Sequence, residues 1–304
     1  MSHTSGWSRR SFLRHGGLVA GLVVAPGLVT ACSRTDTDGS DGGGGGALDQ
    51  LRSQGTITVG IAGEEPYAYL DGGELTGMDP TVQKTIWGNL GIDTVEATQV
   101  SFDGLIPGLN ANRFNVVAAG MFITPERCVE AAFSYPMYCV PNAFLVPPGN
   151  PDDITDFQSV ADAGIRLGVL GGAVEGDFAK QSGVAGSNIV TVPTTRDGLL
   201  QLEQGRLDAF GLTTITLRDV LEQNPDTEVV LTEPFTPVVD GKEQLGCGGA
   251  VFRQEDEELL AAFNEELTKL KESGELLEII EPFGFGPETI PADDVTTQRL
   301  CDGS

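Results

Sequence analysis

The segment with the clearest chemistry is residues 120–127, which read GMFITPER. Arg127 carries a planar guanidinium whose parallel N–H groups suit a carboxylate. Thr124 and Pro125 are typical of a helix start, the first as a hydroxyl cap and the second in the first turn. Free amide groups at a helix start also attract anions. We expect a buried strand to end at Gly120, so this segment predicts an anion-binding site at a strand end.

Two of these side chains have a second interpretation. Arg127 can pair on the surface with Glu126 or Glu130, and Phe122 can be an ordinary core residue. In the functional interpretation, Phe122 instead leaves the strand toward the ligand. The spacing alone is compatible with both, because a surface ion pair and a ligand clamp place the same residue types at the same intervals.

A second chemical segment is residues 62–69, which read AGEEPYAY and follow another apolar run. Glu64 can accept hydrogen bonds from a cation. Tyr67 offers an aromatic face, and such faces attract desolvated cations by about 2 kcal/mol. By itself the segment is also compatible with a solvated turn. Together with Arg127 it predicts a small zwitterionic ligand with a delocalised cation.

The elements that must position these residues alternate between strands and helices. In the first half we expect strands at 56–62, 95–100 and 114–120, helices at 79–90 and 102–112, and a hairpin within 67–77. Such alternation predicts a parallel sheet with helices on both faces. Ligands bind beyond the carboxyl ends of strands in such sheets, where both chemical segments begin.

The second half repeats this pattern, with strands at 166–170, 188–192 and 207–212 and helices near 177–181 and 196–204. A strand at 248–252 and an amphipathic helix at 256–272 are expected to return to the first unit. The sequence therefore predicts two lobes, between which the chain crosses near 140–145 and 246–250. A cleft between hinged lobes is a natural site for a small ligand.

The composition excludes several classes of function. The chain has 44 acidic and 18 basic residues and a formal net charge of -26, which argues against nucleic acid as a partner. Its only histidines are His3 and His15, in a segment that we expect to be removed. Catalytic triads, Cys–His pairs and histidine metal sites are then excluded. We expect no metal, no cofactor and no enzymatic activity.

The N-terminal segment predicts export and lipidation. Residues 8–14 read SRRSFLR and precede an apolar run, 16–31, which is shorter than the roughly 20 residues of a membrane-spanning helix. This pattern is typical of a twin-arginine signal peptide, 1–31. The residues around Cys32 resemble a bacterial lipobox, so Cys32 would carry lipid and 32–46 would form a flexible tether. We expect the protein on the extracytoplasmic face of the membrane or in the periplasm; the alternative is an uncleaved anchor helix.

Four further cysteines leave the disulfide pattern open. Cys128, Cys139, Cys247 and Cys301 allow three full pairings, and sequence does not choose among them. Export by the twin-arginine route implies folding in a reducing cytosol, so the fold should not need a disulfide at first. One bridge formed after export and buried free thiols are both compatible with the sequence.

The motifs resemble those of ABC-transporter solute-binding proteins of the polar amino-acid type over residues 48–290. The similarity is carried by GMFITPER, by FSYP at 133–136 and by KESGE at 271–275. Within that group the chain most resembles ectoine- and hydroxyectoine-binding proteins, through EEPYAY at 64–69, MFITPERC at 121–128 and LGCGG at 245–249.

This resemblance implies an α/β fold of the two-lobed periplasmic-binding-protein type II class, with two hinge crossings. The first lobe would comprise 47–142 and 248–292, the second 143–247, and a C-terminal tail 293–304. The partners would be a small zwitterionic ligand, the permease subunits of an ABC importer, and the membrane through the lipid. The protein is expected to be a monomer.

The resemblance also assigns roles in the site. Tyr67 and Phe122 would sandwich the ligand ring, Arg127 would grip its carboxylate, and Glu64 would accept hydrogen bonds from the ring N–H groups. The loop 171–175 would supply amide donors from the second lobe.

Two positions depart from the patterns of relatives. Ala173, next to Gly172 in that loop, stands where a hydroxyl residue is common. Amino-acid binders carry an ammonium-binding aspartate just after the strand that follows GRLDA, 205–209, and this position falls at Thr213. Asp208 within that motif is expected to be structural. Because Thr213 has no charge, free amino acids are less suitable ligands; its alternative role is to cap a helix.

Two other functions remain open from the sequence. The guest could be a polar or cationic amino acid bound in the same cleft. Some dehydratases resemble this fold, and Glu64, Glu65 or Glu175 could then act as acid or base. The absence of histidine and the lipid tether argue against an enzyme.

Overall fold

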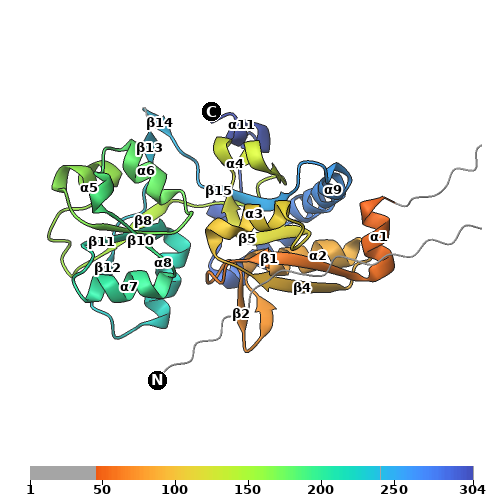
Figure 1. Cartoon of the computed structure of the whole chain (residues 1–304), viewed down its shortest axis with the longest axis horizontal. Coiled ribbons are helices and arrows are strands. Elements are labelled where there is room, and N and C mark those ends of the chain that lie inside the picture. The colour runs from red at the N-terminus through yellow and green to blue at the C-terminus, as the bar shows by residue number, and fades with distance from the viewer. Residues whose placement is uncertain (1–45, 240, 304) are drawn as a thin grey trace, which may run out of the picture. The chain divides into compact units, whose positions relative to one another are not determined.

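The structure is a computed structural model that describes residues 46–239 and 241–303 (Figure 1). The predicted signal peptide, Cys32 and all of the predicted tether except its last residue lie outside the described residues. Within the described part of the chain, no helix has the length and apolar character needed to cross a bilayer.

The first lobe is built on a mixed sheet. Its strands are β1 (Thr56–Ile61), β4 (Thr94–Gln99), β5 (Val116–Phe122), β6 (Ala132–Phe133), β7 (Tyr138–Cys139) and β15 (Cys247–Phe252). They are ordered β4-β1-β5-β15-β6, and β7 also pairs with β15. The accompanying helices are α1 (Ala47–Gln54), α2 (Met78–Asn89), α3 (Leu105–Asn110), α4 (Pro125–Glu130), α9 (Glu257–Ser273) and α10 (Glu275–Ile280).

The second lobe has a sheet of its own. Its strands are β8 (Asn142–Val146), β9 (Leu167–Leu170), β10 (Ile189–Val192), β11 (Ala209–Thr213) and β12 (Val230–Leu231), ordered β10-β9-β11-β8-β12. Its helices are α5 (Phe157–Ala163), α6 (Glu175–Gln181), α7 (Thr195–Glu203) and α8 (Thr214–Gln223). Two small hairpins pair β2 (Tyr69–Asp71) with β3 (Glu74–Thr76), and β13 (Val238–Val239) with β14 (Lys242–Glu243). The predicted hairpin within 67–77 is thus confirmed.

The expectation of purely parallel sheets is wrong in one respect. β1, β4 and β5 are parallel, as are β9, β10 and β11, but β15 runs antiparallel to β5 and β8 runs antiparallel to β11. Both exceptions are strands that enter a lobe directly after the chain leaves the other one. A strand that arrives from the opposite lobe reaches the sheet at the carboxyl ends of its parallel strands, so it continues in the reverse direction.

The positions of these two strands also locate the crossings. β7 ends at Cys139 in the first sheet and β8 begins at Asn142 in the second, whereas the return strand β15 begins at Cys247. Asn142, which was assigned to the first lobe, therefore lies in the second sheet, and Cys247, which was assigned to the second lobe, lies in the first.

The prediction that a strand ends at Gly120 is wrong by two residues. β5 continues through Met121 and Phe122, because these residues pair with Gly249 and Gly248 of β15. Gly120 lies inside the strand with φ +59°, where the register with β15 shifts. Long-range pairing with a strand more than a hundred residues later therefore extends β5 past the glycine.

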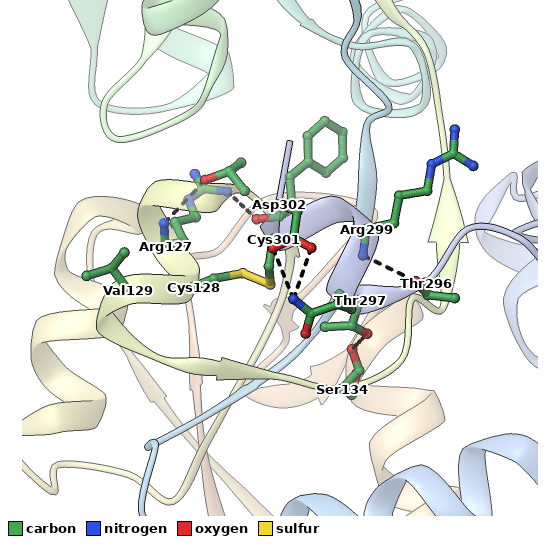
Figure 2. The surroundings of a disulfide bond; sticks show 12 residues. Arg127, Cys128, Val129, Ser134, Thr296, Thr297, Arg299, Cys301 and Asp302 are labelled. Carbon is green, nitrogen blue, oxygen red and sulfur yellow. Dashed lines mark hydrogen bonds between the residues drawn. A yellow bond between two sulfur atoms is a disulfide. The ribbon is translucent and has the colours of Figure 1, made fainter. Parts of the chain in front are cut away.

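Two disulfides resolve the cysteine pattern that the sequence left open. Cys139 pairs with Cys247, across the register of β7 and β15, and Cys128 pairs with Cys301 (Figure 2). The first bridge joins the last residue before one crossing to the first strand residue after the other. It therefore ties together the two chain segments that connect the lobes.

The second bridge holds the C-terminal segment on the first lobe. α11 (Thr297–Cys301) follows a capping contact from Arg299 N to Thr296, and Thr297 Oγ1 donates to Ser134 O at 2.8 Å (Figure 2). Leu300 is buried there against the first lobe. The segment that the sequence suggested as a tail is thus bonded and packed against α4, the helix that carries Arg127.

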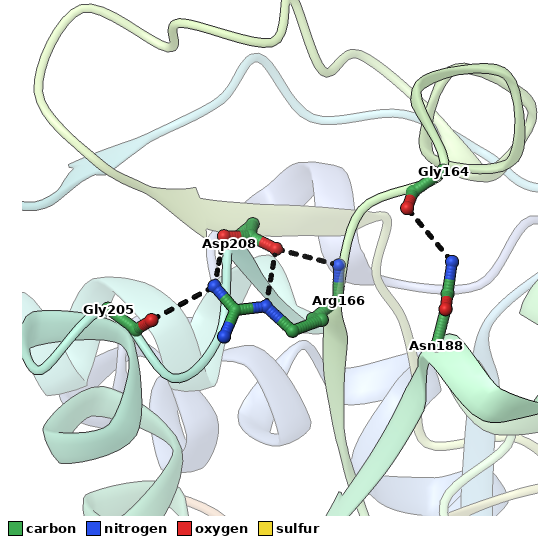
Figure 3. Close-up of polar contacts among 5 residues, drawn as sticks. All are labelled: Gly164, Arg166, Asn188, Gly205 and Asp208. Atoms are coloured by element: carbon green, nitrogen blue, oxygen red, sulfur yellow. Dashed lines mark hydrogen bonds and ion pairs between the residues drawn. The ribbon is translucent and has the colours of Figure 1, made fainter.

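Asp208 has the structural role that the sequence suggested. Its carboxylate accepts three hydrogen bonds from Arg166, from the backbone N at 2.8 Å and from Nε and Nη2 at 2.9 and 2.6 Å (Figure 3). Arg166 holds the pKa of Asp208 below its ordinary value. The pair fixes the starts of β9 and β11, away from the predicted ligand site.

Candidate functional site

Side chains from both lobes enclose a small cavity of about 30 Å³. Seven of the predicted site residues line it: Glu64, Tyr67, Gly120, Phe122, Arg127, Ala173 and Thr213. Thr124 and Gly172 line a larger adjoining cavity of about 900 Å³, to which Phe122 and Arg127 also contribute. The structure therefore brings the nine predicted positions together, whereas Cys32, the predicted lipidation site, lies outside the described residues.

Arg127 is half-buried and turned toward the space between the lobes. Its Nη1 donates to Phe122 O at 2.8 Å and its Nη2 donates to Gly172 O at 3.0 Å, so the side chain joins β5 to the glycine loop of the second lobe. The guanidinium carbon lies 5.4 Å from the centre of the Phe102 ring, in a cation–π contact. Burial lowers the pKa of Arg127, and the nearby Glu175 opposes this shift.

The local fold explains this placement. Thr124 caps α4 by accepting from Arg127 N at 3.3 Å, and Pro125 occupies the first turn, as the sequence predicted. In the described part of the chain, Arg127 forms no ion pair with Glu126 or Glu130, which excludes the surface interpretation for this conformation.

Glu64 is buried, with 8% of its surface exposed, and its Oε1 accepts from Thr216 Oγ1 at 2.7 Å. Burial raises the pKa of Glu64 to about 7, and the Glu175 charge adds to this effect. A carboxylate that is removed from water gains most from a cationic partner. The acid is therefore suited to a cation inside the cavity.

Both predicted aromatic residues, Tyr67 and Phe122, line the cavity and contact Tyr138. The Tyr67 ring contacts the rings of Tyr138 and Phe285, both at 5.4 Å between centroids, and the Phe122 ring lies 6.2 Å from that of Tyr138. Tyr67 Oη also donates to Thr213 Oγ1 at 3.2 Å, which links the two lobes. Tyr138 therefore supports both rings from behind.

Thr213 combines the two roles that the sequence left as alternatives. It caps α8 by accepting from Thr216 N at 3.3 Å, and it lines the cavity at the carboxyl end of β11. Its hydroxyl also lies 3.1 Å from that of Thr216. A chain of hydroxyl groups thus runs from Tyr67 through both threonines to Glu64.

Position 120 requires a residue without a side chain. A Cβ at this position would collide with the Tyr67 ring, and the residue has a left-handed backbone. Its N–H donates to Asp79 Oδ2 at 3.0 Å and its carbonyl accepts from Tyr138 Oη. Asp79 is fully buried, and burial raises its pKa to about 6.

Sequence reasoning missed several residues of the cavity. Phe102, Val174, Glu175 and Leu212 also line it. Phe102 follows the carboxyl end of β4, a third parallel strand, so the argument used for Glu64 and Gly120 could have found it. Val174 and Glu175 were considered as part of the amide-donor loop 171–175, and Glu175 also as a catalytic acid or base, but neither side chain was expected to line the cavity. Within the described residues, no cluster of His, Cys, Asp or Glu is arranged to hold a metal ion.

Comparison with known proteins identifies the family of this chain. The model of the bacterial extracellular solute-binding proteins, family 3, matches residues 57–287. The chain belongs to this family. A probable amino-acid ABC transporter periplasmic-binding protein of Sinorhizobium fredii is 34% identical over 259 residues, which cover 84% of this chain and 85% of that protein.

Two solved structures are similar over most of the chain. The crystal structure of EhuB in complex with hydroxyectoine is 36% identical with a TM-score of 0.77, covering 84% of this chain and 97% of that one. The ancestral amino acid-binding protein AncCDT-1, described as a precursor of cyclohexadienyl dehydratase, is 26% identical with a TM-score of 0.66, covering 78% and 98%.

These comparisons confirm the two-lobed α/β fold of the type II periplasmic-binding class. The family-3 protein is an extracytoplasmic solute-binding protein of the amino-acid ABC transporter type, and its relatives are transporter components. Its partners are accordingly a small ligand and an ABC permease.

Proposed function

We propose that this family-3 protein captures ectoine or hydroxyectoine for an ABC importer. Ectoine is a cyclic amidinium that carries a carboxylate. Arg127 would bind the carboxylate, Glu64 would accept from the ring N–H groups, and Tyr67 and Phe122 would enclose the ring. Phe102, whose ring is in cation–π contact with Arg127, adds a third aromatic side chain to the cavity lining.

The observation that carries this proposal is the composition of the cavity lining. One small cavity is lined by a guanidinium, two buried carboxyl groups and three aromatic rings. A zwitterion with a delocalised, flat cation matches all of them, because aromatic faces and a desolvated carboxylate both favour such a cation. The structural similarity to a hydroxyectoine complex supports the same assignment.

A polar or cationic amino acid is the second candidate, because relatives of the chain are probable amino-acid binders. Thr213 argues against it, since the position lines the cavity without a charge for an α-ammonium group. If this argument is correct, Thr213→Asp should leave ectoine affinity no better and admit amino acids.

Isothermal titration calorimetry tests the ligand. The purified protein should bind ectoine or hydroxyectoine saturably, and a thermal-shift panel should show stabilisation by the same compounds. Heat changes with arginine or glutamine but none with ectoine would refute the assignment. A turnover assay with prephenate-like acids should show no product above background.

We also propose that the protein is exported by the twin-arginine route and anchored through lipid on Cys32, with 32–46 as the tether. The twin arginines and the lipobox-like residues support this. Labelling of cells with a fatty-acid analogue should mark the protein, and Cys32→Ala should abolish the label and release the protein from the membrane.

We further propose that the lobes close around the ligand as two hinged bodies. The first body comprises 47–142 with 248–292 and the second 143–247, with the boundaries shifted by one residue at β8 and β15.

A further inference from the structure

A chain of buried hydrogen bonds runs along one face of α2 and ends behind the ligand cavity. Asp79, Gln83 and Trp87 are four residues apart, so they share a face of the helix, and all three are fully buried. Trp87 Nε1 donates to Gln83 Oε1 at 3.1 Å, and Gln83 Nε2 donates to Asp79 Oδ1 at 3.1 Å. Asp79 Oδ2 then accepts from Gly120 N at 3.0 Å, and Gly120 lines the cavity.

The irregular pairing of β5 explains why the Gly120 N–H needs a side-chain partner. The register between β5 and β15 shifts between Val117 and Met121, and Gly120 lies in this interval. Its N–H points to Asp79, and Gln83 Nε2 also donates to Val117 O at 3.0 Å. A buried backbone N–H without a partner is costly, and a shift in register is where such groups occur. The side chains of α2 therefore satisfy the backbone of β5 beside the site.

Asp79 also holds Tyr67, through its own backbone. Asp79 N donates to Tyr67 O at 3.0 Å, and the preceding Met78 N donates to Pro66 O at 2.9 Å. The first N–H groups of a helix have no acceptor inside the helix, so they are free to bind this loop. The Tyr67 ring lies so close to Gly120 that a Cβ there would collide with it. Asp79 thus joins the two segments that meet at this contact.

The hydrogen-bond pattern requires acceptors on both oxygens of Asp79. An indole N–H can only donate, so Trp87 fixes Gln83 with its Oε1 toward the indole and its NH2 group toward Asp79. A carboxylate satisfies the Gln83 NH2 group and the Gly120 N–H together, whereas an amide side chain would turn its own NH2 group toward one of them. Burial raises the pKa of Asp79 to about 6, and the bonds from Gly120 and Gln83 oppose this shift, so the carboxylate is the main form at neutral pH.

We propose that Asp79 is a positioning residue of the ligand site: it fixes Tyr67 and Gly120 relative to each other and so places the Tyr67 ring where the ligand ring binds. This inference rests on the proposed function, because it takes Tyr67 as one of the rings that enclose the ligand. Asp79 lines neither the small cavity nor the larger adjoining one. It therefore acts through these two residues and not by contact with the ligand.

The experiment measures ectoine and hydroxyectoine affinity by calorimetry for the wild type and for Asp79→Asn. Asparagine has nearly the same size and shape, but its NH2 group must face either the Gln83 NH2 group or the Gly120 N–H. Two donors that face each other in a buried place push their groups apart, and a binding site loses affinity when its groups are displaced. We expect the affinity of Asp79→Asn to fall by about tenfold.

Trp87→Phe is the matched control. It leaves Gln83 Oε1 without its donor in the same buried chain but keeps both hydrogen bonds of the Asp79 side chain. Phenylalanine also keeps a ring that packs on Phe252 and Phe263. Trp87→Phe should therefore lower stability in urea unfolding and leave affinity within about threefold of the wild type. An equal loss of affinity in both variants would show that the chain acts only through general stability, and would overturn the inference.

A double-mutant cycle with Tyr67→Leu tests the route by which Asp79 acts. Leucine removes the ring that Asp79 is proposed to place, so adding Asp79→Asn to Tyr67→Leu should weaken binding by less than about threefold. If Asp79→Asn weakens binding equally with and without the ring, Asp79 does not act through Tyr67 and the inference fails. A residue that only stabilises the lobe would give this additive result.

A measurement on the wild type needs no variant to fold. In hydrogen exchange followed by NMR, the Gly120 amide should exchange slowly, because its N–H is bonded to a buried carboxylate. Exchange as fast as that of Gly72, in the exposed turn between β2 and β3, would overturn the inference. If arginine or glutamine binds but ectoine does not, the ligand assignment fails and the cycle is measured with that amino acid. If no zwitterion binds, both proposals fail.

Discussion

Replacement of Arg127 by alanine should reduce ectoine affinity by at least about 2 kcal/mol, a factor of about 30 in dissociation constant. The guanidinium has five N–H donors. Two of its nitrogens are committed to Phe122 O at 2.8 Å and Gly172 O at 3.0 Å, which leaves further N–H groups for a ligand carboxylate. A hydrogen bond between charged partners contributes about 1.5–3 kcal/mol, and alanine would remove more than one.

Arg127→Ala should also destabilise the closed conformation, because Arg127 links β5 to the glycine loop of the second lobe. Calorimetry gives the affinity, and small-angle scattering with and without ectoine reports whether the lobes close. Arg166→Ala is the control: it removes another arginine, paired with Asp208 and remote from the cavity, and should leave affinity unchanged. An affinity of Arg127→Ala within threefold of the wild type would refute the carboxylate clamp.

Four other substitutions test separate parts of the site. Gly120→Ala should abolish detectable binding with little loss of secondary structure by circular dichroism, because the new Cβ displaces the Tyr67 ring; normal affinity would contradict this. Glu64→Gln should weaken binding yet stabilise the unliganded protein at pH 8 by up to about 3 kcal/mol. The reason is the raised pKa of Glu64, which makes the wild type lose stability as pH rises from 4.5 to about 7. Urea unfolding of both proteins at pH 4 and pH 8 checks the sign of this difference. Thr216→Val should lower affinity by removing the hydrogen bond to Glu64, and an unchanged affinity would show that the hydroxyl chain does not support the site. Replacing Cys128 and Cys301 by serine should lower the melting temperature and increase proteolysis of the C-terminal segment, whereas equal melting curves would show that α11 packs without its bridge.

Much of the fold could be predicted from periodicity and turn residues. The strands and helices of both lobes, the hairpin at Gly72 and Gly73, and the two lobes themselves follow from local patterns of apolar residues. The errors lie where distant segments meet. β5 passes beyond Gly120 because β15 pairs with it, and β8 and β15 run antiparallel because each comes from the other lobe.

The candidate site was predictable in part for the same reason. Glu64 follows β1 and Gly120 lies near the carboxyl end of β5 in the first sheet, whereas Thr213 ends β11 in the second sheet. Ligands bind beyond the carboxyl ends of parallel strands, so the convergence of these residues on one cleft was inferable. Phe102 follows such a strand too, and that argument was not extended to it. Glu175 and Thr216 matter through their contacts with Asn142 and Glu64, and no spacing in the sequence reports a contact over 152 residues.

The amino-acid sequence by itself determined the type of chemistry. It contains no histidine beyond position 15, it places an arginine, an acid and aromatic residues at strand ends, and it has a strongly acidic composition. These properties are local or additive, so they can be counted without a fold. Tertiary structure alone decided the cysteine pairing, the approach of Glu175 to Arg127 and the hydroxyl chain across the cavity. The reason is physical: a raised pKa, a cavity and a disulfide each depend on the distance between groups that the chain separates, and that distance exists only after both lobes have packed.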